Sequence, residues 1–71
     1  MTKDEALRLI EEAANADANT LKGEETLEAI AWDSLASVSF VGLVDERLGR
    51  QIDAKELAKC RTVPDLLALL Q

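Results

Sequence analysis

The stretch Trp32-Asp33-Ser34-Leu35 decides the fold, because a polar part of the chain gives way here to a long segment of periodic apolar residues. Asp33 is typical of a helix N-cap, and Ser34 follows it as the first residue of the predicted helix. A hydroxyl at that position lies near unpaired backbone N–H groups at the positive end of the helix dipole. Because such a helix end favours anions, Ser34 is a candidate site for a phosphodiester.

The main helix is predicted over residues 34–48, ending at Gly49 in the left-handed conformation that terminates many helices. Its apolar stripe is wide, which indicates contacts on more than one surface. Gly42, inside this helix, weakens it by about 1 kcal/mol relative to alanine. We expect it to make room for a bound chain or a close helix contact. We also expect mostly buried side chains lining a cavity beside this helix at Phe40, Val41, Val44 and Leu66.

Shorter helices are predicted on either side. Residues 3–14 form the first, with Thr2 and Glu5 as a capping box. A long connection, residues 15–31, follows, with a possible turn of helix over 26–31 and with Leu21, Leu27 and Ile30 as its anchors. A short helix begins at Asp53 and ends near Lys59, and residues 62–65 start the last, with a proline in its first turn. The fold class is therefore all-α: a small four-helix bundle with a long loop between helices 1 and 2 and a short third helix.

Composition limits the classes of function. The chain has 71 residues, which we expect to form one domain over 1–71. Its formal net charge of −6 argues against binding to nucleic acid. No apolar run is long enough for membrane insertion, and the start does not resemble a signal peptide. With its lone Cys60, the chain is expected to be cytoplasmic and monomeric.

Catalytic and metal sites are not expected. The sequence contains no histidine, so no Ser-His-Asp triad can form, and one cysteine does not make a zinc site. Cys60 is interpreted as a small packed residue rather than a reactive thiol. The acid pairs Glu11-Glu12 and Glu24-Glu25 are expected to be solvated rather than to bind cations.

Several segments together carry a likeness to a known family. They are residues 27–35, the apolar positions Val38, Phe40, Val41, Val44 and Leu48, the step Gly49, Ile52 and Asp53, and residues 61–66. Over nearly its whole length the chain resembles the acyl carrier proteins. The resemblance implies that Ser34 carries 4′-phosphopantetheine through a phosphodiester. It also implies that the chain itself catalyses nothing, because the reactive thiol belongs to the prosthetic group.

The resemblance implies partners as well. A phosphopantetheinyl transferase would attach the group from coenzyme A, with magnesium. Asp33 would help it to hold the metal and the coenzyme A phosphate, a role compatible with that of N-cap. Acyl-transferring, condensing or acyl-activating enzymes would then use the loaded carrier.

The predicted partner surface departs from the family pattern. Many fatty-acid carriers have acids early in the second helix, where this chain has Ala36, Ser37 and Ser39. Acids return only at Asp45 and Glu46. The partner-binding residues are therefore predicted to be Leu35, Val38, Asp45 and Glu46, in a specialised fatty-acid, polyketide or lipid pathway. Packing in the core is the alternative for Leu35 and Val38.

Two other functions remain open at this point. A peptidyl or aminoacyl carrier shares the fold and the prosthetic group, but those proteins often have two glycines where this chain has Ala31 and Trp32. Trp32 is interpreted here as a loop anchor. A helical interaction module without a carrier role is the second alternative, and the retained Asp33-Ser34 pair argues against it.

Overall fold

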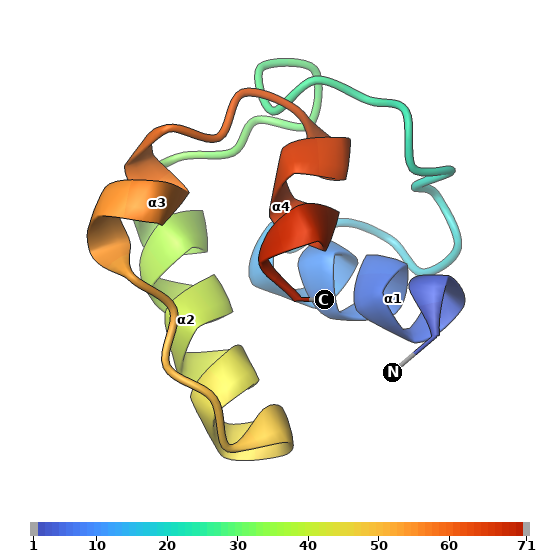
Figure 1. Cartoon of the computed structure of the whole chain (residues 1–71). Coiled ribbons are helices and arrows are strands. Elements are labelled where there is room, and N and C mark those ends of the chain that lie inside the picture. The colour runs from blue at the N-terminus through green and yellow to red at the C-terminus, as the bar shows by residue number, and fades with distance from the viewer. Residues whose placement is uncertain (1, 71) are drawn as a thin grey trace.

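The computed structural model describes residues 2–70 and contains helices α1 (Lys3–Ala13), α2 (Ser34–Leu48), α3 (Ala54–Ala58) and α4 (Val63–Leu69) (Figure 1). Within this part of the chain, no strand forms, and a single antiparallel bridge joins Thr26 to Thr62. The predicted all-α fold with a long first connection and a short third helix is confirmed. None of these helices is long and apolar enough to cross a membrane.

The helix ends follow the signals in the sequence. Thr2 forms the predicted capping box with Glu5, and Thr62 forms another with Asp65 at the start of α4. Gly49 ends α2 with φ of 64°, a left-handed conformation that glycine adopts without a steric penalty. The first helix ends one residue earlier than predicted, since Ala14 is its C-cap. Over residues 27–31 the structure has turns rather than a helix.

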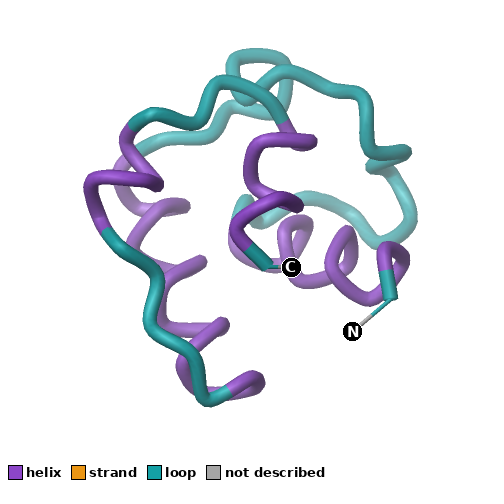
Figure 2. Tube along the Cα trace, viewed as in Figure 1, coloured by secondary structure: helices purple, strands orange, loops and turns teal. Residues whose placement is uncertain are grey.

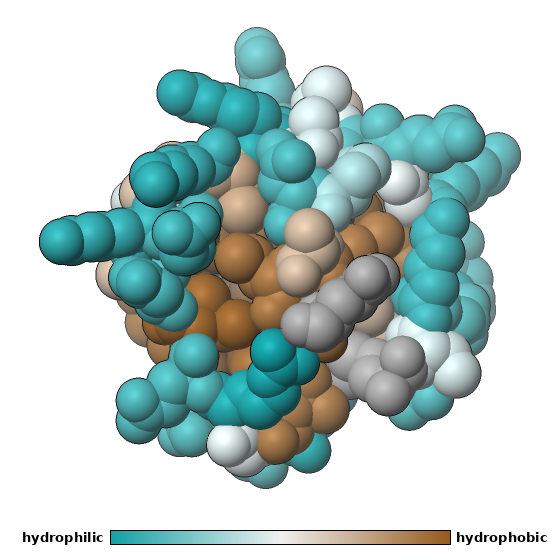
Figure 3. Space-filling view, in the orientation of Figure 1, coloured by the Kyte–Doolittle hydropathy of each residue, from teal (hydrophilic) through white to brown (hydrophobic). Residues whose placement is uncertain are grey.

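The helices enclose one core. α1 packs against α2 and α4, and α4 also contacts α3. The connection between α1 and α2 runs over the top of the molecule in Figure 2, where it is the longest loop segment. As predicted, Leu21 and Leu27 are buried in the core and Ile30 packs against it. Figure 3 shows apolar side chains gathered in the middle of one face, with hydrophilic ones around them.

The side chains predicted to be buried differ in their surroundings. Phe40, Val44 and Leu66 are each 0% exposed, in agreement with the prediction. Val41 is half-buried and lines a hollow of about 350 Å³ between α2 and α3, named here the α2–α3 hollow. The other three do not line this hollow, so that part of the prediction is wrong. Phe40 and Val44 are enclosed because their side of α2 faces α1, and Leu66 packs into the same core from α4.

Gly42 does not serve a close helix contact. It lies on the exposed side of α2, where an added Cβ would meet nothing within 4 Å. It does not line the α2–α3 hollow either. The expectation that it makes room for a neighbouring helix is therefore wrong.

The expectation of a solvated Glu11 is wrong as well. Glu11 is 2% exposed, and its carboxylate accepts hydrogen bonds from the backbone N–H groups of Asn19 (3.0 Å) and Leu21 (2.7 Å). Arg8 places its Nε 2.8 Å from the same carboxylate and donates to the Leu21 carbonyl at 2.9 Å. Because the loop buries Leu21 against α1, its polar backbone groups need partners there, and Glu11 and Arg8 supply them.

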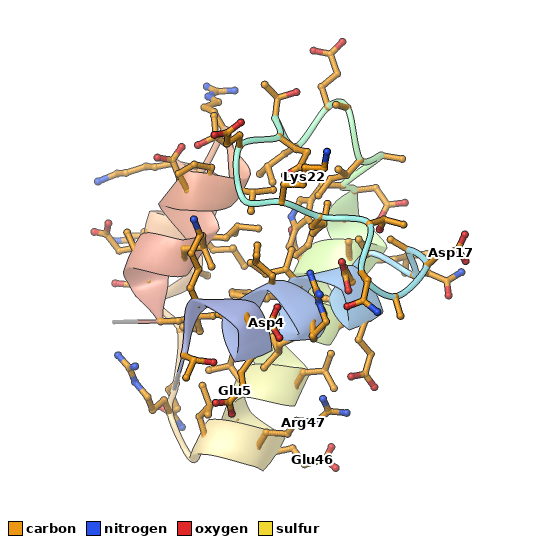
Figure 4. All side chains as sticks on the ribbon, turned by 90° about the vertical axis from the view of Figure 1, so that its right-hand side faces the viewer. Asp4, Glu5, Asp17, Lys22, Glu46 and Arg47 are labelled. Atoms are coloured by element: carbon orange, nitrogen blue, oxygen red, sulfur yellow. The ribbon has the colours of Figure 1, made fainter. Side chains whose placement is uncertain are left out.

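Glu12 is exposed, as expected, but it also joins two helices. Its carboxylate lies 2.6 Å from the Arg47 guanidinium near the end of α2. Figure 4 shows Arg47 and Glu46 at that end of α2, below α1. An exposed pair of this kind stabilises the fold by no more than about 1 kcal/mol. The packing of the apolar side chains is therefore what holds α2 in place.

Replacing Phe40 by alanine should lower the free energy of unfolding by about 3–5 kcal/mol, because it leaves a cavity in a close-packed core. Chemical denaturation measures the change. Val38→Ala is the matched control, since Val38 lies on the same helix and is 71% exposed. Equal midpoints for the two variants would contradict the burial of the Phe40 ring.

Candidate functional site

Ser34 lies at the exposed start of a 15-residue helix. Asp33 is its N-cap, as predicted: a side-chain oxygen accepts the Ala36 N–H at 2.8 Å, and the Asp33 carbonyl accepts the Ser37 N–H at 3.0 Å. The N–H groups of Ser34 and Leu35 belong to the first turn and have no carbonyl partner within the helix. Together with the helix dipole, they favour negative charge beside the Ser34 hydroxyl.

A groove of about 760 Å³ lies beside this hydroxyl and is named here the serine groove. Loop residues before α2, the first turns of α2, and the end of α3 with the segment after it form its walls. The lining residues are Thr26, Leu27, Glu28, Trp32, Asp33, Ser34, Ser37, Leu57, Ala58, Cys60, Arg61 and Thr62.

Backbone hydrogen bonds hold two walls of the serine groove together. The Leu27 N–H donates to the Arg61 carbonyl at 3.0 Å, and the Val63 N–H donates to the Glu25 carbonyl at 2.8 Å. Asp65 accepts the backbone N–H groups of Arg61 (2.9 Å) and Thr62 (3.1 Å), and these bonds hold the pKa of Asp65 below its ordinary value. The walls therefore come from segments far apart in the sequence, whose pairing the sequence analysis did not foresee.

Glu25 closes the turn that leads into this wall. Its carboxylate accepts the backbone N–H groups of Lys22 (2.8 Å), Gly23 (3.0 Å) and Glu24 (3.0 Å). These bonds, that from Lys22 above all, lower the pKa of Glu25 from 4.5 to about 2. The expectation of a freely solvated Glu24-Glu25 pair is wrong for Glu25, because the tight turn leaves successive N–H groups that need an acceptor.

Trp32 anchors the loop, as predicted. Its backbone N–H donates to the Leu27 carbonyl at 3.0 Å, and its ring meets that of Phe40 edge-on with centroids 5.6 Å apart. Its indole N–H also donates to the Ser37 hydroxyl at 3.0 Å. The sequence analysis missed this role of Ser37, although its spacing of three residues from Ser34 places it on the same side of a helix.

The predicted partner residues share the exposed side of α2. Leu35 is 76% and Val38 is 71% exposed, which excludes packing in the core for both. Asp45 and Glu46 are exposed on the same side but lie roughly 16 Å further along the axis, at 1.5 Å per residue. Glu46 points away from the molecule in Figure 4.

Ala36 does not belong to that surface. It is 5% exposed, and Ser37 is half-buried beside Trp32, whereas Ser39 is exposed. Many fatty-acid carriers have acids where this chain has Ala36, Ser37 and Ser39. Of these three positions, only Ser39 is therefore exposed enough to face a partner.

Cys60 is half-buried, and its thiol donates to the Glu56 carbonyl at 3.5 Å. Burial raises the pKa of the Cys60 thiol, and the negative charges of Asp65 and Glu56 raise it further. A thiol with a raised pKa is a poor nucleophile at neutral pH, in agreement with a packed residue. Within residues 2–70, no group of three or more potential ligands is placed to hold a metal ion.

The chain matches a known family over most of its length. Residues 4–70 match the family model described as phosphopantetheine attachment site. The chain belongs to this family. Its prosthetic group is 4′-phosphopantetheine, covalently attached. No curated protein and no solved structure gives a significant match.

The residues of this carrier domain fit that group. An exposed hydroxyl, the helix N–H groups beside it and the Arg61 side chain along the serine groove suit a phosphodiester and a polar arm. Among the residues described, hydrogen-bond donors suited to a phosphodiester therefore lie around Ser34.

In Glu25→Gln, the free energy of unfolding should fall less steeply as the pH is lowered than it does in the parent protein. The carboxylate stays ionised in the folded state down to a pKa of about 2 but takes up a proton near 4.5 when unfolded. Its contribution is therefore complete above pH 4.5 and is lost as the pH falls toward 2. Urea midpoints measured across this range should fall less steeply in the variant than in the parent protein. Glu24→Gln removes the same charge and should keep the parent's slope; equal slopes in all the proteins would contradict this role of Glu25.

Proposed function

We propose that this chain is an acyl carrier protein that holds acyl intermediates as thioesters on 4′-phosphopantetheine attached to Ser34. The single observation that carries the proposal is the exposed Ser34 hydroxyl at the start of α2, within a chain that matches the family over residues 4–70. Ala31 and Trp32, where peptidyl carriers often have glycines, support the acyl rather than the peptidyl type. The chain acts as a cytoplasmic monomer and catalyses no reaction itself.

Each residue of the attachment site has a separate task. The Ser34 oxygen would form the phosphodiester with the phosphopantetheine half of coenzyme A, as the pyrophosphate bond breaks and adenosine 3′,5′-bisphosphate and the hydroxyl proton are released. The N–H groups of the first turn stabilise the resulting negative charge. Asp33 caps the helix with one carboxylate oxygen, and its exposure leaves the carboxylate accessible to the transferase's magnesium ion. When bound, the group supplies the thiol that carries the acyl chain.

The exposed side of α2 is proposed as the surface that partner enzymes bind. Leu35 and Val38 offer an apolar contact close to Ser34, and Asp45 and Glu46 offer charge at the far end of the helix. Partner enzymes with basic patches near the attachment site find no acid at Ser39 or Gly42. Because complementary charge steers association and suppresses wrong partners, the carrier is proposed to serve a specialised pathway.

Incubation with coenzyme A, magnesium and a phosphopantetheinyl transferase should add one phosphopantetheine group to the parent protein. Intact-mass spectrometry detects it. Ser34→Ala should gain none, because the attacking oxygen is gone. Ser39→Ala is the control, since it removes another exposed hydroxyl from the same helix. Addition to Ser34→Ala would overturn the assignment of the site.

Ser39→Glu combined with Gly42→Asp should improve loading and elongation by a general fatty-acid synthase system, which the parent protein serves poorly. Both positions are exposed on α2, so the new charges face a docking enzyme. The gain in rate should be greater at low salt, because exposed charges are screened as ionic strength rises.

A charge-matched control is Ala18→Asp with Ala68→Glu, at exposed positions on the long loop and on α4. It should leave the elongation rate unchanged. Efficient use of the parent protein by the general system, with no response to the added acids, would refute the specialised pathway but not the carrier function.

A further inference from the structure

The serine groove and the α2–α3 hollow adjoin each other. Ser37 on α2, with Leu57 and Ala58 on α3, lines both of them. The remaining residues of the hollow are Val38, Val41 and Ala54, all apolar. The serine groove, in contrast, also contains polar side chains such as those of Glu28, Arg61 and Thr62. The character of the surface therefore changes from polar to apolar at Ser37.

Ser37 lies on the path between these two spaces. Ser34, Ser37 and Val41 follow one another at spacings of three and four residues, so they lie along one side of α2. An acyl chain at the far end of an arm on Ser34 contacts Ser37 when it enters the hollow, because Ser37 lines the hollow together with Val41. On the α3 side, Leu57 and Ala58 line both the serine groove and the hollow.

Trp32 holds the Ser37 hydroxyl at this boundary. The indole N–H is a donor only, and it donates to Ser37 at 3.0 Å. The ring itself cannot turn away freely, since it packs edge-on against Phe40, which is 0% exposed. If the Ser37 hydroxyl left, a half-buried indole N–H would lose its partner, which costs free energy.

We propose that Trp32 and Ser37 form a polar threshold that disfavours entry of an apolar acyl chain from Ser34 into the α2–α3 hollow. An alkyl chain that crosses the boundary covers the Ser37 hydroxyl and removes it from water without giving it a hydrogen bond. A chain of medium length therefore stays accessible to solvent and to partner enzymes. The proposal rests on the proposed attachment at Ser34. Trp32 acts through Ser37 and is a positioning residue.

The test compares the parent protein with Ser37→Ala, which removes the hydroxyl, and Trp32→Phe, which removes the donor but keeps an aromatic ring against Phe40. Ser39→Ala is the matched control, an exposed serine of the same helix. A phosphopantetheinyl transferase with magnesium loads each protein from octanoyl-coenzyme A or acetyl-coenzyme A, and hydroxylamine then cleaves the thioester. Octanoyl cleavage should slow in Ser37→Ala and Trp32→Phe by roughly two- to tenfold, the factor that the net contribution of one hydrogen bond gives. The acetyl cleavage rates of these two variants should equal that of the parent protein. In Ser39→Ala, both the octanoyl and the acetyl rates should equal those of the parent.

A second measurement needs no loading. The unloaded proteins are titrated with S-octanoyl-N-acetylcysteamine while NMR follows the methyl groups of Val38 and Val41. Ser37→Ala and Trp32→Phe should bind this probe more tightly than the parent and Ser39→Ala. The threshold would be overturned if all the proteins had the same ratio of octanoyl to acetyl cleavage rates and the same affinity for the probe. A parent protein that accepts no acyl group would contradict the attachment at Ser34, whereas the titration would still decide the role of Ser37.

Discussion

The pairing of residues 25–27 with residues 61–63 is the constraint on which the surroundings of Ser34 depend. Two backbone hydrogen bonds, Leu27 N–H to the Arg61 carbonyl and Val63 N–H to the Glu25 carbonyl, tie the long loop to the start of α4. This tie places the loop before α2 opposite the segment after α3, and the serine groove lies between them. Without it, Ser34 would still begin a helix, but it would have no groove beside it.

Carboxylates, rather than apolar contacts alone, hold the long connection in its path. Glu11 accepts two loop N–H groups from within α1, and Glu25 accepts three in its own turn. A loop without helix or strand leaves many backbone donors unpaired, and a carboxylate satisfies several at once. Part of the acidic character of this chain is therefore structural, and it is not available for binding partners.

Each side of α2 has a different task. Ala36, Phe40 and Val44 face the core and fix the helix. Leu35, Val38, Asp45 and Glu46 are exposed on the side where partner enzymes are proposed to bind. Between these two sides, Ser34, Ser37 and Val41 run along the serine groove and the α2–α3 hollow. This division explains the wide apolar stripe in the sequence: one part of it is core, Val41 and the exposed Val38 line the hollow, and Leu35 is open to water.

The sequence by itself determined the helices and their ends, the all-α class and the candidate Ser34. These features depend on local chemistry: Thr2, Asp33 and Thr62 cap the helices that follow them, and Gly49 adopts the conformation that ends α2. Only the tertiary structure decided that Glu11 is buried, that Ala36 faces the core, and that Trp32 bonds to Ser37. The first two facts depend on which segments meet in the fold, and the third depends on how the loop turns the Trp32 ring back onto α2, where it packs on Phe40. Periodicity identifies an apolar side of a helix, but it does not say which neighbour covers each part of that side or which polar groups the neighbour brings.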